Sequence, residues 1–235
     1  MEREYNEALR LNGNSKNYNF SDIQKLEGNP MEGKTLCVLG SSVAYGASSS
    51  GDAVGEYFEK RFGCKLVKEA VSGTTLADLD DSSYVSRLLN NVTEEKVDLF
   101  ICQLSTNDAT KNIKLGEISE GKNFSDFDKK TVIGAMEYII RYAQTTWNCP
   151  VAFFTGSYYN SDNYAKMVEA LKALSEKWDI CVLNLYDDPE FNDLTEEERS
   201  IYMSDDIHPK RAGYRDWWGP ELERQLLVFM EKNTQ

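Results

Sequence analysis

Apolar residues from Thr35 onward follow two alternating patterns along the chain. Five short runs are apolar nearly throughout, and longer stretches between them carry apolar residues at three- and four-residue spacing. Runs of the first kind are typical of parallel strands covered on both faces, and stretches of the second kind are typical of amphipathic helices. The expected strands are Thr35–Leu39, Cys64–Lys68, Asp98–Leu104, Val151–Thr155 and Ile180–Leu185.

The stretches between and after these runs predict the helices. They are Gly55–Phe62, Leu76–Asn90, Lys130–Thr146, Tyr164–Lys177 and Ala212–Lys232. Strands that alternate with helices indicate strand-crossover-strand units. We therefore predict an α/β chain: a three-layer α/β/α doubly wound (flavodoxin-like) domain with a five-stranded parallel sheet. Ligands bind such a domain where the strands end and the loops begin.

The remaining segments predict the domain organisation. Residues 1–33 are polar, with one short helical patch around Glu7 to Leu11, and we expect an arm packed on a single domain formed by residues 34–235. The long connection Asn112–Asp128 is either a surface loop or a lid.

Composition narrows the possible partners. Of 235 residues, 41% are hydrophobic, which fits an ordinary globular domain and excludes a disordered chain. The net charge of −13 repels nucleic-acid backbones and anionic lipid surfaces, so we expect neither partner. The apolar runs are far shorter than the roughly 20 residues that span a bilayer. The polar, acidic start is unlike a secretory signal, and we expect a cytoplasmic protein.

Cysteine usage argues against a metal or redox centre. The chain has five cysteines and no Cys-x-x-Cys pair, and Cys37, Cys102 and Cys181 lie within predicted strands. A thiol in such a run acts as a small apolar side chain. We expect no metal ion.

The first predicted strand ends in Gly40-Ser41-Ser42-Val43-Ala44-Tyr45-Gly46. Glycines at such a corner allow a tight turn, and a helix that begins nearby directs unpaired N–H groups into the same space. The corner therefore fits a serine nucleophile beside an oxyanion site, a phosphate-binding loop, or a plain turn without a ligand.

Two further strand ends carry small or polar residues. The second predicted strand leads into Glu69–Thr75, which contains Gly73, and the third ends in Ser105-Thr106-Asn107-Asp108. The Asn107 amide can donate toward the crevice near Ser42, or Asn107 and Asp108 only cap the following turn.

His208 is the only histidine in the chain, within Ser204-Asp205-Asp206-Ile207-His208-Pro209. Any serine hydrolase with a histidine base must therefore use His208. Asp205, three residues upstream, is placed to bind one ring nitrogen and leave the other facing the serine. The corner after the first strand lacks the Gly-x-Ser-x-Gly elbow, the Walker loop and the dinucleotide fingerprint.

In this order, the four strand ends resemble the SGNH hydrolases, or GDSL-type esterases and lipases. The family's Gly-Asp-Ser-x-x-x-Gly block resembles residues 40–46, its second glycine falls on Gly73, its Gly-x-Asn-Asp block on residues 105–108, and its Asp-x-x-His-Pro block on residues 205–209. Ser41 and Ser105 depart from the family's Asp and Gly, so hydrogen bonding around the nucleophile must differ.

The resemblance implies a serine esterase without a cofactor. Ser42 is its nucleophile, His208 its base and Asp205 the orienting acid, while the oxyanion meets the N–H groups of Ser42 and Gly73 and the Asn107 amide. The acidic surface favours small soluble carboxylic esters, such as acetylated carbohydrates.

Two points stay open from the sequence. Tyr45, Tyr158 and Trp217 lie near predicted strand ends or the final loop, where each either binds substrate or only packs. The rival function from another class is a non-catalytic flavodoxin-like module that holds FMN or another phosphate ligand at the Gly/Ser-rich loop.

Overall fold

Five parallel strands form one sheet in the computed structural model, which describes residues 12–232. The strands are β1 (Thr35–Gly40), β2 (Lys65–Ala70), β3 (Leu99–Gln103), β4 (Val151–Phe154) and β5 (Cys181–Leu183). Their order is β2-β1-β3-β4-β5, which is the flavodoxin-like order. Each strand boundary lies within two residues of the expected one, and the predicted fold class is confirmed.

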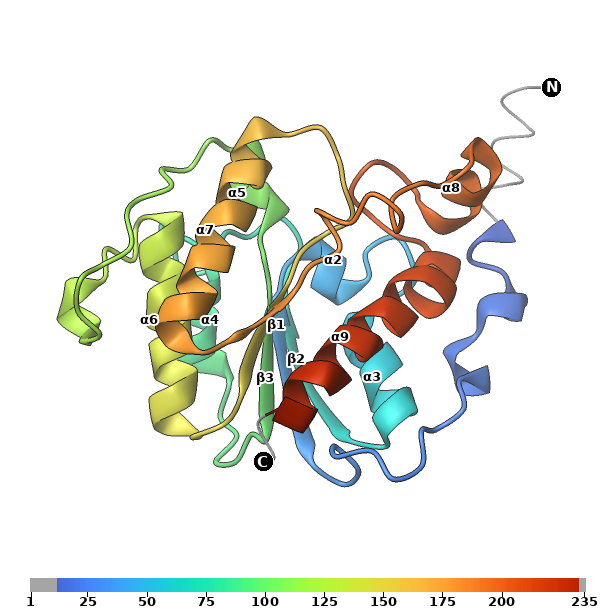
Figure 1. Ribbon diagram of the computed structural model, residues 1–235, viewed down its shortest axis with the longest axis horizontal. Helices are drawn as coiled ribbons and strands as arrows, with labels where there is room; N and C mark the ends of the chain where they lie inside the picture. Colours follow the sequence, from blue (N-terminus) through green and yellow to red (C-terminus); the bar gives the residue numbers. More distant parts are fainter. Residues whose placement is uncertain (1–11, 233–235) are drawn as a thin grey trace.

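Helices cover both faces of the sheet (Figure 1). One face carries α4 (Tyr84–Asn91), α6 (Val132–Thr146) and α7 (Asp162–Trp178), and the other carries α3 (Val54–Phe62) and α9 (Gly219–Lys232). Side chains of β1 alternate between the two layers: Cys37 and Leu39 pack in the first, and Leu36 and Val38 in the second. Both faces are buried, so the strands are apolar throughout.

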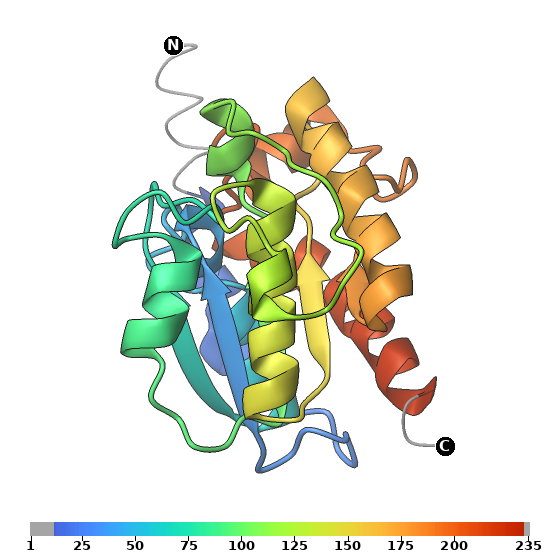
Figure 2. The same cartoon turned by 90° about the vertical axis from the view of Figure 1, so that its left-hand side faces the viewer.

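Shorter helices complete the chain at the loops. They are η1 (Lys16–Tyr18), η2 (Phe20–Asp22), α2 (Ser42–Tyr45), α5 (Thr106–Thr110), η3 (Phe124–Asp126), α8 (Glu196–Tyr202) and the π-helical η4 (Gly213–Trp218). All strand arrows point to one end of the molecule, where α5 lies (Figure 2). The polar residues at the strand ends therefore meet at one edge.

The helix predicted over Leu76–Asn90 is wrong in its first half. The structure has a loop up to Ser83, which caps the helix by accepting a hydrogen bond from the N–H of Ser86. The N–H groups of Leu76 and Ala77 donate instead to the buried carboxylate of Asp108. A distant side chain thus satisfies these two N–H groups, which would lack an acceptor even at the start of the predicted helix.

The described part of the arm, residues 12–33, lies along α3. The rings of Phe20 and Tyr57 meet edge to face with centroids 6.5 Å apart. The Asn29 amide donates to the carbonyl oxygen of Phe62 at 3.1 Å. The helical patch expected around Glu7 to Leu11 lies outside the described residues.

The connection Asn112–Asp128 runs along the outer side of α6, away from α2 (Figure 1). The Lys177 ammonium on α7 donates to the carbonyl oxygens of Ser119 and Gly121, at 2.6 and 2.8 Å, and lies 2.6 Å from the buried Glu137 carboxylate. Glu137 also accepts the N–H of Ser119 at 2.9 Å. These contacts hold the connection as a surface loop, the first of the two alternatives.

Candidate active site

Ser42 begins α2 immediately after β1. The chain turns sharply there because Gly40 has no side chain: a Cβ at this position would collide with Ala44 and Gln103. Ser42 is buried, and its backbone N–H is the first of the helix, so it has no acceptor inside α2. The hydroxyl and this N–H both belong to the rim formed by the strand ends.

His208 lies beside Ser42 although 166 positions separate them in the sequence. The Ser42 Oγ and the His208 Nε2 are 2.8 Å apart. On the other side of the ring, the His208 Nδ1 lies 2.9 Å from the Asp205 Oδ2. A serine, an imidazole and a carboxylate are therefore connected in series, the arrangement expected of a hydrolytic triad.

Asp205 also shapes the turn that presents the imidazole. Its Oδ1 accepts the N–H groups of Ile207 and His208, both at 2.8 Å. Burial acts to raise the pKa of Asp205, but these backbone bonds and the contact with His208 outweigh it, and the pKa lies below its usual value. Asp205 is therefore held as a carboxylate facing the ring.

The neighbouring Asp206 points elsewhere. Its side chain is 85% exposed and lies 3.5 Å from the Arg199 guanidinium. Of the two adjacent acids, only Asp205 contacts His208 within the described residues.

The loop after β2 carries Gly73 in a left-handed conformation, with φ of +82°. A glycine is favoured there because other residues are strained at positive φ. Three side chains of the α5 segment hold this loop: Asn107 donates to the Thr74 carbonyl at 2.9 Å, Lys111 donates to the Gly73 carbonyl at 2.7 Å, and Asp108 accepts two N–H groups farther along.

Ser105 explains why Asn107 and Asp108 are available for this contact. The Ser105 hydroxyl caps α5 by accepting the N–H of Asp108 at 3.3 Å. Ser105, rather than Asn107 or Asp108, is therefore the residue that caps α5. Burial raises the pKa of the Asp108 carboxyl, against the hydrogen bonds it accepts.

Gln103, at the end of β3, organises the turn before Ser42. Its Oε1 accepts the N–H groups of Ser41 and Ala44, each at 2.9 Å, and its Nε2 lies 3.1 Å from the Ser41 Oγ. Both side chains are buried. Ser41, which stands where the family has Asp, thus contacts a glutamine that sequence reasoning missed, because one glutamine in an apolar strand gives no distinct signal.

Arg87 is a second residue that sequence reasoning missed. Its guanidinium is buried under the loops, where it donates to the carbonyl oxygen of Gly40 at 2.8 Å and to the Thr74 hydroxyl at 3.1 Å. The same group forms a 3.0 Å ion pair with Glu69. Arg87 therefore links the loop after β1 to the loop after β2 through its buried guanidinium.

The three aromatic candidates occupy different environments. Tyr45 on α2 is half exposed, and the Lys68 ammonium lies over its ring. Trp217 stacks on Phe191 and on Tyr202, with centroids 4.8 and 5.8 Å away, so its ring is used in packing.

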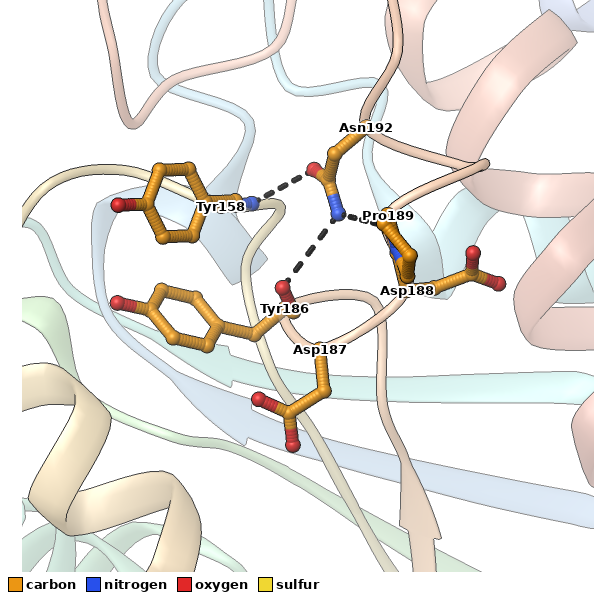
Figure 3. Close-up of a pocket in the computed structure, with 6 residues that line it drawn as sticks. All are labelled: Tyr158, Tyr186, Asp187, Asp188, Pro189 and Asn192. Atoms are coloured by element: carbon orange, nitrogen blue, oxygen red, sulfur yellow. Dashed lines mark hydrogen bonds between the residues drawn. The ribbon is translucent and has the colours of Figure 1, made fainter.

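Tyr158 lines a pocket of about 380 Å³ at the ends of β4 and β5 (Figure 3). Its ring lies beside that of Tyr186, with centroids 5.2 Å apart. The Asn192 amide joins the two walls: it accepts the N–H of Tyr158 and donates to the carbonyl oxygen of Leu185, both at 2.7 Å. The pocket is also lined by Asp187, Asp188 and Pro189.

The part of the chain that the structure describes shows neither a metal-binding cluster nor a membrane-spanning helix. Within residues 12–232, no group of three or more His, Cys, Asp or Glu side chains could hold a metal ion. In the same part of the chain, no helix is long and apolar enough to cross a membrane.

Several solved structures share this fold. A candidate GDSL-like lipase from Bacteroides ovatus is 20% identical, with a TM-score of 0.59 over 86% of this chain and 99% of that one. A candidate lipolytic protein of the G-D-S-L family from Desulfitobacterium hafniense is 17% identical, with a TM-score of 0.62 over 82% and 99%. A member of the same family from Veillonella parvula is 17% identical, with a TM-score of 0.58 over 81% and 96%.

The family itself is established by sequence. No curated protein matches the chain. The model of the GDSL-like lipase/acylhydrolase family, however, matches residues 38–215, which include all four strand-end motifs. The chain therefore belongs to the GDSL-like lipase/acylhydrolase family and is an ester-hydrolysing serine hydrolase.

Proposed function

We propose that this protein is an esterase for small soluble carboxylic esters, with Ser42 as nucleophile, His208 as general base and Asp205 as the orienting acid. The observation that carries the proposal is the 2.8 Å contact of the Ser42 Oγ with an imidazole whose other nitrogen lies 2.9 Å from a carboxylate. Family membership favours this function over an FMN-binding module.

The reaction has two halves. His208 removes the proton of the Ser42 hydroxyl while the oxygen attacks the ester carbonyl carbon, and Asp205 supports the resulting imidazolium. The alcohol leaves with that proton, and Ser42 keeps the acyl group. Water then attacks the acyl-enzyme by the same route, which releases the acid and restores the serine.

Three donors are suited to the oxyanion. They are the N–H of Ser42 at the start of α2, the N–H of Gly73, and the second amide hydrogen of Asn107, whose first hydrogen binds the Thr74 carbonyl. Loss of one such donor reduces the rate by about 10²–10³-fold. The bonds of Lys111 and Asp108 to the Gly73 loop keep these donors in place before substrate arrives.

We assign the binding of the substrate's alcohol portion to the aromatic residues. Parallel strands lie about 4.8 Å apart, so the pocket beside β4 and β5 is two to three strands from Ser42 on the same edge. Tyr158 at this pocket and Tyr45 beside the nucleophile offer half-exposed rings on which a sugar can stack. Acetylated carbohydrates fit this arrangement.

We assign the catalytic machinery to residues 34–235, with residues 1–33 as an accessory arm. The contacts of residues 12–33 with α3 support this division.

Substitution of the nucleophile and base tests the function. Ser42→Ala and His208→Ala should each reduce hydrolysis of p-nitrophenyl acetate by roughly 10⁴-fold or more, because neither half of the reaction proceeds without them. Ser125→Ala, at an exposed serine of η3, is the matched control and should retain full activity. Turnover near wild type in a folded Ser42→Ala protein would contradict the proposal.

The two adjacent acids test the role of Asp205. Asp205→Ala should reduce kcat by roughly 10³-fold, less than His208→Ala, because an orienting group contributes less than the base. Asp206→Ala should leave kcat unchanged, since Asp206 points to Arg199. The reverse ranking of these two variants would show that the wrong carboxylate has been assigned.

A further inference from the structure

The arm contacts both segments that carry Ser42 and His208. The Asn14 Nδ2 donates to the carbonyl oxygen of Ser48, in the turn after α2, at 2.8 Å. The Asn14 Oδ1 accepts the N–H of Arg211, three residues beyond His208, at 2.9 Å. We call these two hydrogen bonds the Asn14 bridge.

Arg211 reinforces the same junction. Its Nε lies 2.6 Å from the Asp52 Oδ2, and its Nη1 donates to the Asn14 carbonyl at 3.2 Å. Arg211 and Asp52 are both partly buried. The turn after α2 and the segment after His208 are therefore joined directly by an ion pair and through the arm by Asn14.

The neighbouring residue fixes the arm against the same segments. Gly13 accepts the N–H of Ala212 at 2.9 Å. A Cβ at Gly13 would collide with the carbonyl oxygen of Ile201 and with the Lys210 side chain. The arm thus lies directly against α8 and the chain around residue 210, and the Asn14 amide is held at its position.

This placement bears on the reaction because the Ser42–His208 contact joins two separate segments. A reacting pair that moves by about 1 Å loses up to 10²-fold in rate. The amide of Asn14 bonds one segment with its nitrogen and the other with its oxygen. It therefore limits the movement of α2 relative to the turn that presents His208.

We propose that Asn14 is a positioning residue that holds the nucleophile turn and the histidine turn in register. The proposal rests on the roles proposed above for Ser42 and His208. Asn14 lies outside residues 38–215, the part that the family model matches, so family membership does not supply this role.

Kinetics of three variants test the proposal. Asn14→Ala should lower kcat for p-nitrophenyl acetate by about tenfold with KM unchanged, because it loses both bridge bonds without touching the substrate. Asn14→Asp keeps the acceptor for Arg211 and should lose only about threefold. Asn17→Ala is the matched control: this exposed asparagine of the arm makes no side-chain hydrogen bond in the described part, and kcat should not change.

A second readout reports on the reactivity of the Ser42–His208 pair without substrate turnover. The rate at which a fluorophosphonate modifies Ser42 should fall by the same factors as kcat. The midpoint of thermal unfolding of each variant checks that the variant is folded at the assay temperature. Wild-type kcat and modification rate in folded Asn14→Ala would overturn the proposal, as would an equal loss in Asn17→Ala or a change confined to KM. If Asn14→Ala does not fold, an unchanged modification rate in Asn14→Asp overturns the proposal, and a lowered rate supports it.

Ser42→Ala separates this proposal from the function on which it rests. A fully active Ser42→Ala protein would remove the proposed function itself. An inactive Ser42→Ala protein beside an unaffected Asn14→Ala protein would remove only the role of Asn14.

Discussion

The carboxylate of Asp205 has two tasks, one in the turn and one at the imidazole. It closes the turn by accepting two backbone N–H groups, and it contacts His208. Both sets of contacts favour its ionised form, so its pKa lies below the usual value. Asp205 therefore links local stability to the geometry of the site.

The stability of the fold should depend on pH through Asp205. A carboxyl whose pKa is lower in the folded chain stabilises the fold above the pH at which the unfolded chain ionises, about pH 4, and this stabilisation is lost as pH falls toward the folded pKa. Asp205→Asn lacks the charge at every pH. The difference in free energy of unfolding between wild type and Asp205→Asn, measured in urea, should therefore shrink as pH falls from 7 to about 3. A difference that stays constant would contradict this linkage.

The residues that chemistry singles out were the easiest to find in the sequence. A sole histidine, an acid three positions before it and a serine at a glycine corner predict a short list, and the structure brings Ser42, His208 and Asp205 together. Trp217 is a further candidate from the sequence, but its ring stacks on Phe191 and Tyr202. An aromatic residue near a strand end packs or binds according to its neighbours, which the sequence does not display.

At the scale of single elements, α2 depends on its neighbour β3. A helix of four residues cannot persist alone, since its end groups outnumber its internal hydrogen bonds. Gln103 supplies the acceptor for the N–H groups of Ser41 and Ala44. The direction of the free N–H of Ser42 follows from this contact.

Gln103→Leu should damage both stability and rate. Two buried N–H groups lose their acceptor, which costs about 2–4 kcal/mol of unfolding free energy, and a displaced α2 should lower kcat by about 10–100-fold. Ser41→Ala removes only a side-chain hydroxyl and should cost about 1 kcal/mol. Urea unfolding and ester kinetics on both variants check the order. Equal effects of the two substitutions would show that the Gln103 side-chain oxygen does not determine the position of α2.

Elements with a strong local pattern could be predicted, and elements set by distant contacts could not. The five strands follow from short runs that are apolar nearly throughout, and the long helices α6 and α7 follow from apolar periodicity. The segment before Tyr84 carries the same periodicity, yet Asp108, about 30 positions away, binds its N–H groups at Leu76 and Ala77. The short helices α2, α5 and α8 have too few residues for any periodic signal.

Across the whole molecule, the structure separates a stabilising cluster from the reactive edge. Glu137 on α6 is fully buried and pairs with Lys177 on α7, and the Trp178 indole N–H also donates to it at 3.1 Å. The cluster fastens the connection over Ser119 and Gly121 on the side of the molecule away from α2 (Figure 1).

Glu137→Gln should therefore destabilise the protein without changing its activity. Removal of one partner leaves the Lys177 charge uncompensated, at a cost of about 3 kcal/mol. The comparison is Glu169→Gln, which removes an exposed partner of Lys172 and should cost less than about 1 kcal/mol. Urea unfolding should separate the two variants, while kcat/KM measured under native conditions stays at the wild-type value for both. A selective loss of kcat/KM in Glu137→Gln would connect this cluster to the active site.

The contacts of the arm could not be predicted from the sequence either, because they too join residues that are distant along the chain. Asn14 and Arg211 are 197 positions apart. Asn14 lies in a polar segment and Arg211 at a helix start, and neither residue stands out there. Their pairing follows only once the fold has placed the segment after β1 beside the beginning of the final helical segment.

These long separations also dictate when the enzyme becomes competent during its synthesis. A ribosome delivers residues from the amino terminus, so β1 to β5 emerge well before the imidazole at position 208 and the guanidinium at 211. A nascent chain halted at about residue 200 already contains every strand but has no base, and it should be inert toward both ester and fluorophosphonate. Competence should therefore appear only once the chain has been translated past His208 and Arg211.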